Sequence, residues 1–145
     1  MHGKRRYEDI QVGEKSVFHK TVGEADIFAF CGITGDFNPI HVDEEYAKQT
    51  RWQGRIAHGL LVASMVTQTL SSLLGEGAVH VSQEVAFVAP VHIGDSITVV
   101  SEVIEKIDDK RRVVVSTVWT NQDGTTVITG RGAVLIPRDK TGCNQ

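Results

Sequence analysis

Residues 34–43, TGDFNPIHVD, place a carboxylate, an amide, a proline and an imidazole within six positions. An aspartate and a histidine that face one point can hold a water molecule and remove its proton, because both are common general acid–base groups. Asp36 and His41 form such a pair if the chain between them bends. This segment is therefore the first candidate for acid–base chemistry.

Neither a regular helix nor a strand would bring the two side chains together. They are five positions apart, which puts them on different sides of a helix and on opposite faces of a strand. Pro39 breaks a helix and biases Asn38 towards extended backbone. Gly35 permits a further unusual backbone angle. We therefore predict a bent loop that aims Asp36 and His41 at one point.

The same residues also have a structural interpretation. Asp36 and Asn38 are typical of an Asx-turn followed by a helix N-cap, in which case His41 would be an exposed bystander. The spacing alone favours this structural interpretation. A catalytic interpretation needs support from another part of the chain.

That support comes from residues 55–59, RIAHG, which open a long uncharged segment. Residues 59–75, GLLVASMVTQTLSSLLG, contain no charged side chain, which predicts a helix that is buried nearly all round. The free N–H groups at the start of a buried helix favour a developing negative charge. An acid, a histidine and such a helix start suit chemistry on a thioester, with a base for water and a donor for an enolate oxygen.

The periodicity of the chain predicts the elements that position these residues. A strand is expected at residues 16–22, a short helix at 24–33 and a helical turn at 44–48. From residue 79 the chain is rich in β-branched residues divided by turn signals. Short connections imply antiparallel neighbours, so we predict an α+β fold with an antiparallel sheet around the apolar helix. The four further strands are expected at residues 79–88, 96–107, 111–121 and 125–136.

Composition excludes several classes of function. The chain has 145 residues, of which 41% are hydrophobic and 23% charged, as in one globular domain. Its net charge of −3 argues against a nucleic-acid or membrane-surface partner. Nothing resembles a signal peptide or a membrane span. Cys31 and Cys143 form neither a disulfide framework nor a metal motif, so we expect no metal site and a cytoplasmic location.

The motif residues resemble a known family. Residues 34–43, with the Tyr-Ala pair at 46–47, are similar to the hydratase-2 motif of the MaoC-like, (R)-specific enoyl-CoA hydratases. AHGLL at 57–61, FVAPV at 87–91 and the Gly-Asp pair at 94–95 look like that family as well. The resemblance runs from about residue 7 to 137, so we expect residues 1–145 to be one domain with a polar tail at 138–145. The family implies a hot-dog fold, in which an antiparallel sheet wraps around a long helix.

The resemblance also implies roles for individual residues, and it makes the catalytic interpretation of the loop the favoured one. Asp36 and His41 would hold the water that adds to C3 of a trans-2-enoyl-CoA, giving an (R)-3-hydroxyacyl-CoA. We prefer His41 as the base. Asn38 would help to hold the site or the substrate, and the N–H of Gly59 would bind the thioester oxygen. No cofactor is expected, because coenzyme A is part of the substrate.

Two further residues, Thr67 and His58, have two interpretations each. Thr67 stands where some bacterial members carry a serine near the site, although its hydroxyl is equally able to bond to its own helical turn. His58 is family-like, but we favour a structural role at the start of the helix. The candidates for binding CoA phosphates are Arg51, Arg55 and the basic turn at residues 110–112.

Two rival functions share the expected fold. A hot-dog thioesterase would cleave the C–S bond, but its carboxylate usually lies on or near the long helix, where this chain has none. A non-catalytic acyl-binding subunit would not need the intact set of Asp36, Asn38 and His41. Since an unpaired β-branched edge invites pairing, we also predict a homodimer or larger homo-oligomer with the site near the interface.

Overall fold

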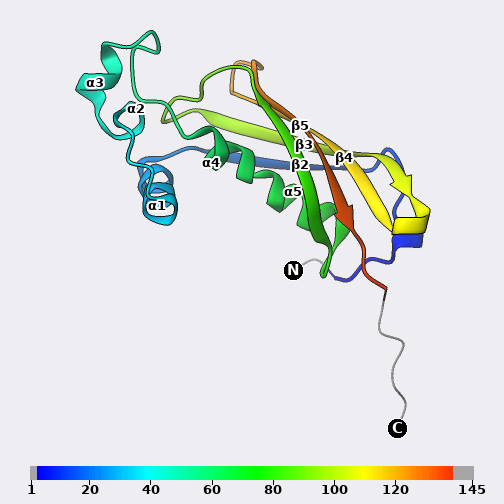
Figure 1. Cartoon of the computed structure of the whole chain (residues 1–145). Coiled ribbons are helices and arrows are strands. Elements are labelled where there is room, and N and C mark those ends of the chain that lie inside the picture. The colour runs from blue at the N-terminus through cyan, green and yellow to red at the C-terminus, as the bar shows by residue number, and fades with distance from the viewer. Residues whose placement is uncertain (1–2, 139–145) are drawn as a thin grey trace.

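A computed structural model describes residues 3–138, which form a five-stranded antiparallel sheet in the order β1–β3–β4–β5–β2 (Figure 1). All five predicted strands are confirmed, and each end lies within one residue of its predicted position. The bounds are β1 Lys15–Thr21, β2 Val79–Phe87, β3 Ser96–Ile107, β4 Arg112–Thr120 and β5 Thr126–Leu135.

The expectation that β2 and β3 are neighbours is wrong. β2 pairs with β5 at one edge, whereas β3 pairs with β1 and β4. The eight residues 88–95 are long enough to cross the ends of β4 and β5, because an extended chain spans roughly 3.3 Å per residue. This crossing connection covers one end of the sheet.

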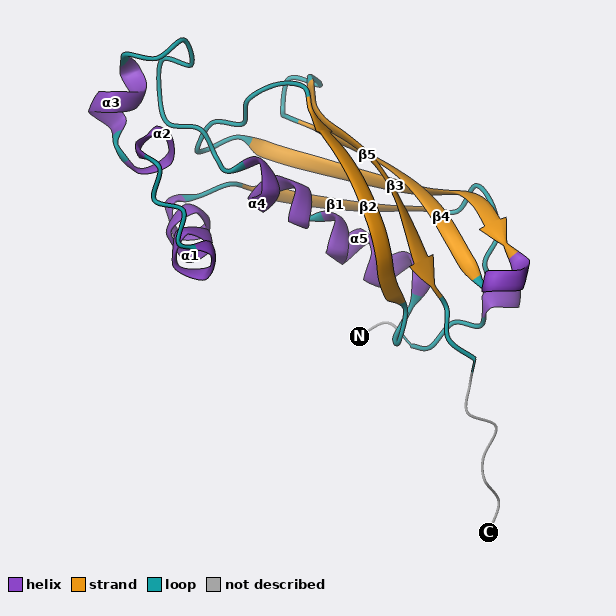
Figure 2. Ribbon diagram, viewed as in Figure 1, coloured by secondary structure: helices purple, strands orange, loops and turns teal. Residues whose placement is uncertain are grey.

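The uncharged segment is helical and lies along the sheet (Figure 2), as predicted, but it is divided into α4 (Gly59–Ser64) and α5 (Val66–Leu74). At the break, the buried indole of Trp119 donates its Nε1–H to the carbonyl oxygen of Val62 over 3.0 Å. The prediction that this segment is buried nearly all round is wrong, because the sheet covers only one side of it. The exposed positions are Leu60, Ser64, Thr67, Gln68 and Ser71.

Three buried hydroxyl groups connect α5 to the sheet. Thr69 Oγ1 donates to the carbonyl of Val66 and lies 2.8 Å from it, and it is also 2.7 Å from Ser101 Oγ on β3. Ser101 Oγ in turn lies 2.8 Å from Thr117 Oγ1 on β4. These side chains are almost inaccessible to solvent. Each hydroxyl therefore meets the hydrogen-bonding needs of its neighbour inside an otherwise apolar core.

The α-helices between β1 and the uncharged segment gather beyond one end of the sheet (Figure 1). The 3₁₀ helix η1 (Tyr7–Asp9) lies near the N-terminus, and a second, η2 (Asp108–Lys110), occupies the β3–β4 turn at the other end of the sheet. The helix predicted at 24–33 and the turn at 44–48 are confirmed as α1 (Glu24–Thr34) and α3 (Glu44–Lys48). Sequence reasoning missed α2 (Pro39–Val42), because it treated Pro39 as a helix breaker.

The arrangement is the predicted α+β hot-dog fold, with one antiparallel sheet wrapped around a helical segment. Within residues 3–138, no helix is both long enough and apolar enough to cross a membrane. The predicted polar tail lies, apart from Arg138, outside the described residues, and so does Cys143.

We expect Trp119→Phe to lower the free energy of unfolding by about 1–3 kcal/mol, the usual range for losing a buried hydrogen bond together with some packing. Urea unfolding measures this difference. The matched control is Trp52→Phe, because Trp52 is only partly buried, and it should change stability by less than about 1 kcal/mol. Equal losses in the two variants would show that the indole N–H does not stabilise the helix break.

Candidate active site

The loop that carries Asp36 is held by the side chains of Asp36 and Asn38, which form a turn and a helix cap. α1 ends at Thr34 and is capped by Gly35, whose φ of +76° is in the left-handed region and whose N–H donates to Cys31 O over 2.8 Å. Asp36 Oδ1 accepts the N–H of Asn38 at 3.1 Å. Asn38 Oδ1 then accepts the N–H of Ile40 at 3.2 Å and caps α2, with proline at the first helical position. The Asx-turn and the N-cap of the structural interpretation are therefore both present.

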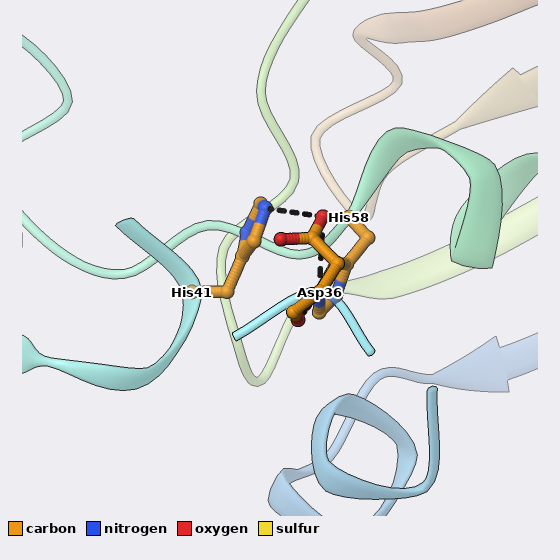
Figure 3. A group of neighbouring side chains, drawn as sticks. All are labelled: Asp36, His41 and His58. Carbon is orange, nitrogen blue, oxygen red and sulfur yellow. Dashed lines mark hydrogen bonds and ion pairs between the residues drawn. The ribbon is translucent and has the colours of Figure 1, made fainter. Parts of the chain in front are cut away.

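The second oxygen of Asp36 gives the loop a further role. Asp36 Oδ2 lies 3.9 Å from His41 Nε2 and 3.8 Å from His58 Nε2 (Figure 3). The predicted convergence of Asp36 and His41 is therefore observed. The idea of His41 as an exposed bystander is wrong, since His41 is only 9% exposed while half of the Asp36 side chain is accessible.

The tautomer of His41 follows from its backbone contact. Nδ1 lies 2.7 Å from the carbonyl oxygen of Ile56, so Nδ1 carries the hydrogen and donates it. Nε2 is then left with a lone pair that faces Asp36. Burial of the ring lowers the pKa of His41 below its ordinary value of 6.5, and the bond to Ile56 O opposes this shift only in part. His41 is thus arranged to accept a proton through Nε2 near neutral pH.

His58 lies in the site, although the sequence favoured only a structural role for it at the start of the helix. Its ring stacks on that of His41, with centroids 3.8 Å apart and planes inclined by 27°. Its Nε2 lies 3.0 Å from the backbone oxygen of Asp36. The family-like AHG at 57–59 was the available signal, but a sequence does not show which way the ring at the helix start turns.

Asp36, His41 and His58 each offer one possible metal-ligand atom, and these atoms lie within 4.8 Å of one another. The geometry does not favour an ion, because an imidazole coordinates a metal in its own ring plane. Two stacked, nearly parallel rings do not aim their lone pairs at one point. Nε2 of His58 is in addition the donor to the Asp36 carbonyl. The arrangement suits proton transfer better than metal binding.

These side chains face a cavity of about 570 Å³, a size typical of small-ligand sites. Its deep end is apolar and buried, whereas its mouth includes the half-exposed side chains of Phe87 and Val88. The crossing connection after β2 supplies one wall. The residues that line the cavity include Asp36, His41, His58, Gly59, Leu60 and Phe87.

Gly59 contributes both a donor and space. As the first residue of α4, it has a backbone N–H with no acceptor inside its own helix. A Cβ at this position would lie 2.7 Å from a ring carbon of Phe87. The glycine therefore lets the aromatic ring pack directly against the helix start, beside the cavity.

Two of the other predicted site residues support the loop instead of lining the cavity. Asn38 is exposed and acts through its cap on α2. Arg55 was expected to bind a phosphate, but its guanidinium forms an ion pair with Glu24 and its Nε donates to His41 O over 2.6 Å. These bonds tie α2 to α1, so Arg55 is committed to the protein itself.

The remaining predicted residues differ in where they lie. Arg51 is exposed at the cavity mouth, with its guanidinium carbon 4.1 Å from the centroid of the Trp52 ring. Thr67 is exposed away from the cavity, and its hydroxyl donates to Ser64 O over 2.9 Å, as the helical-turn alternative proposed. The basic turn at residues 110–112 belongs to the opposite end of the sheet (Figure 1). Of these candidates, Arg51 alone borders the site.

The chain is similar in sequence and in fold to several known proteins. The model of the MaoC like domain family matches residues 9–124. The chain is 40% identical over 132 residues to an (R)-specific enoyl-CoA hydratase of Rhodospirillum rubrum, covering 90% of this chain and 91% of that one. It is 39% identical over 133 residues to a 3-hydroxybutyryl-CoA dehydratase of Methylorubrum extorquens, covering 91% and 84%. The solved (R)-hydratase of Aeromonas caviae, involved in PHA biosynthesis, matches with a TM-score of 0.86 and 34% identity over 90% and 99% of the two chains.

We expect the pKa of His41 to lie below 6.5, because the buried ring disfavours the imidazolium ion. A pH titration of the histidine ring signals by NMR measures it. The His41 signal is assigned by its loss in His41→Asn, a variant whose amide nitrogen takes the place of Nδ1 and keeps the donor to Ile56 O.

The same shift predicts a pH dependence of stability. As the pH falls below 6.5, the unfolded chain binds a proton at this position before the folded chain does. The contribution of His41 to the free energy of unfolding is thus complete above pH 6.5 and is lost as the pH falls through the folded-state value. His41→Asn should lack this part of the pH dependence. An NMR midpoint at or above 6.5 would contradict the assignment of His41 as a buried, neutral base.

Proposed function

This chain belongs to the MaoC-like family, and from that premise we propose that it is an (R)-specific enoyl-CoA hydratase, a hydro-lyase that also catalyses the reverse dehydration. The observation that carries the proposal is the pairing of Asp36 Oδ2 with the lone pair of His41 Nε2 at the wall of an apolar cavity. The activities of the relatives, an enoyl-CoA hydratase and a 3-hydroxybutyryl-CoA dehydratase, support the same reaction in both directions.

The gap between the acid and the imidazole suits a bound water molecule. At 3.9 Å the two atoms are too far apart for a direct hydrogen bond, and a water on the cavity side can reach both. It donates one hydrogen to Asp36 Oδ2 and the other to His41 Nε2. As its oxygen bonds to C3 of the enoyl group, His41 takes the proton and the C2–C3 π electrons move towards the thioester.

The negative charge that moves to the thioester oxygen needs a donor. We assign this role to the N–H of Gly59, at the start of α4, and a donor of this kind is worth roughly 3 kcal/mol in the transition state. The enolate then collapses as C2 takes up the proton held by the Asp36–His41 pair. Because one pair both removes and returns the proton, both additions occur on the same face of the double bond.

Three further expectations accompany this mechanism. We propose that the reaction needs no cofactor or metal ion, because the water is activated by side chains alone. Arg51, exposed at the cavity mouth, is our candidate for the CoA phosphates. We also propose a cytoplasmic location on the basis of cysteine usage.

We further propose a homodimer formed through the free edge of β2. This strand pairs with β5 on one side only and exposes Val79, Val81 and Phe87. The opposite edge, β1, carries lysines, which discourage edge pairing. Since Phe87 also lines the cavity, a second copy at this edge would lie close to the site.

The catalytic assignment predicts that Asp36→Asn lowers the rate of crotonyl-CoA hydration roughly 10²–10⁴-fold, the usual scale for losing a positioned acid–base group. His41→Asn should lose a similar amount, and the double variant should be far less than additively worse, because the two groups act as a unit. Loss of enone absorbance, release of free thiol and the stereochemistry of the product are measured together.

Asp43→Asn is the matched control for these variants, because Asp43 caps α3 through Tyr46 N and lies outside the cavity lining. It should retain near-normal hydration. The proposal fails if Asp36→Asn hydrates as fast as the control or if the product is the S alcohol. Release of thiol by the wild-type protein without loss of the enone would identify a thioesterase instead.

The assembly proposal predicts that Val81→Lys on the edge of β2 converts the protein to a monomer, because a buried unpaired ammonium opposes association. Sedimentation should give twice the chain mass of 15.9 kDa for the wild type and the single mass for the variant. Val17→Lys replaces another exposed valine, on β1, and this variant should stay dimeric. A wild-type monomer at micromolar concentration would overturn the proposal.

A further inference from the structure

His58 stands at the N-cap of α4, yet its side chain makes no cap hydrogen bond. Residues at this position commonly use their side chains to satisfy the first N–H groups of a helix. The ring of His58 turns away from α4, towards Asp36 and His41, and is only 3% exposed. A structural role at the helix start therefore does not account for this histidine.

The bond from His58 to the loop fixes its tautomer. Nε2 lies 3.0 Å from the backbone oxygen of Asp36, and a carbonyl oxygen only accepts, so Nε2 carries the hydrogen. Nδ1 is then a buried acceptor that has no hydrogen-bond partner among residues 3–138. A buried polar atom without a partner costs free energy, so the orientation of this ring is maintained at a cost to stability.

The ring of His58 is enclosed on three sides. α1 contributes the ring of Phe30, with centroids 4.9 Å apart, and Cys31 Sγ, 3.7 Å from Nε2. The loop contributes Asp36, and α2 contributes the stacked ring of His41. These contacts hold His58 between α1 and the two groups that we assign to the reaction.

We propose that His58 is a positioning residue, which fixes the Asp36 backbone through its Nε2–H and supports the His41 ring by stacking, so that Asp36 Oδ2 and His41 Nε2 keep the spacing a water molecule needs. This inference rests on the proposed hydratase function. His58 itself transfers no proton to the substrate. Its role is to hold the acid and the base at a fixed separation, since displacing a reacting group by about 1 Å can cost 10²-fold in rate.

Histidine is suited to this position because it combines a flat ring with an N–H donor. His58→Gln keeps a donor near the place of Nε2 but loses the ring that stacks on His41. His58→Phe keeps a stacking ring but loses the donor to Asp36 O. The two variants therefore separate the two contacts, and His19→Gln, at an exposed position on β1, is the matched control.

The environment of His41 predicts how these variants differ in pH dependence. The groups facing His41 are the His58 ring, the Asp36 carboxylate, the carbonyl of Ile56 and, at its backbone oxygen, the guanidinium of Arg55. His58→Gln removes the ring that covers His41, so water reaches the imidazole more easily and the acidic limb of kcat/KM moves to higher pH. His58→Phe keeps the cover and should leave this limb where it is.

The test is steady-state hydration of crotonyl-CoA across pH, with circular dichroism and sedimentation to establish folding and assembly. We expect kcat to fall roughly 10–10²-fold in both variants, with KM changed much less, and the acidic limb to move only in His58→Gln. His19→Gln should match the wild type. Normal kcat and an unmoved limb in both folded variants would overturn the proposal, as would a loss of activity that only follows the loss of folded protein.

A second measurement separates this inference from the hydratase proposal. The NMR midpoint of His41 is measured in the wild type and in both variants without any substrate. If the wild type fails to hydrate crotonyl-CoA, the proposed function fails, but a midpoint raised in His58→Gln alone still supports the positioning role. An identical midpoint in all three proteins would overturn it.

Discussion

The hydrogen bond from His41 Nδ1 to the carbonyl of Ile56 is the contact on which the site depends. It decides which ring nitrogen faces the cavity, and it joins α2 to the segment that leads into α4. The same segment is fixed from two other directions, because Ile56 N donates to Ile40 O and Ala57 N donates to Val91 O. The helices beyond the end of the sheet are thus attached to the crossing connection and to the helix start by short backbone bonds, and the cavity lies where they meet.

Asp36 shows that the structural and catalytic interpretations of the loop were never exclusive. One carboxylate oxygen closes the turn, and the other faces His41. Because Oδ1 is held by the N–H of Asn38, rotation of the carboxylate is restricted, and Oδ2 has a fixed direction without a second protein donor. A turn-forming residue is for this reason a good place for an acid that must be both oriented and accessible.

Features encoded locally were predictable from the sequence, and those that depend on distant partners were not. Strand ends followed from period-two patterns and turn residues, and the convergence of Asp36 and His41 followed from Gly35 and Pro39 together with the family resemblance. The prediction that β2 and β3 are neighbours was wrong, because which strands pair in a sheet depends on long-range packing. The ion pair of Arg55 was not predictable for the same reason, since its partner Glu24 lies 31 positions away and nothing nearby in the sequence indicates it. The direction of the His58 ring likewise depends on α1 and the loop.

The buried hydroxyls of Thr69, Ser101 and Thr117 have a consequence for how α5 sits on the sheet. Apolar contacts are non-directional, so a helix held only by valine and leucine side chains has several registers of similar energy along a smooth sheet. Sliding α5 by one turn would separate the Thr69 hydroxyl from Ser101 and leave polar groups unsatisfied in the core. The hydrogen bonds between these hydroxyls therefore favour a single register of α5 on the sheet. Because α4 continues into α5 with only Met65 between them, that register also sets the depth at which the helix start enters the cavity.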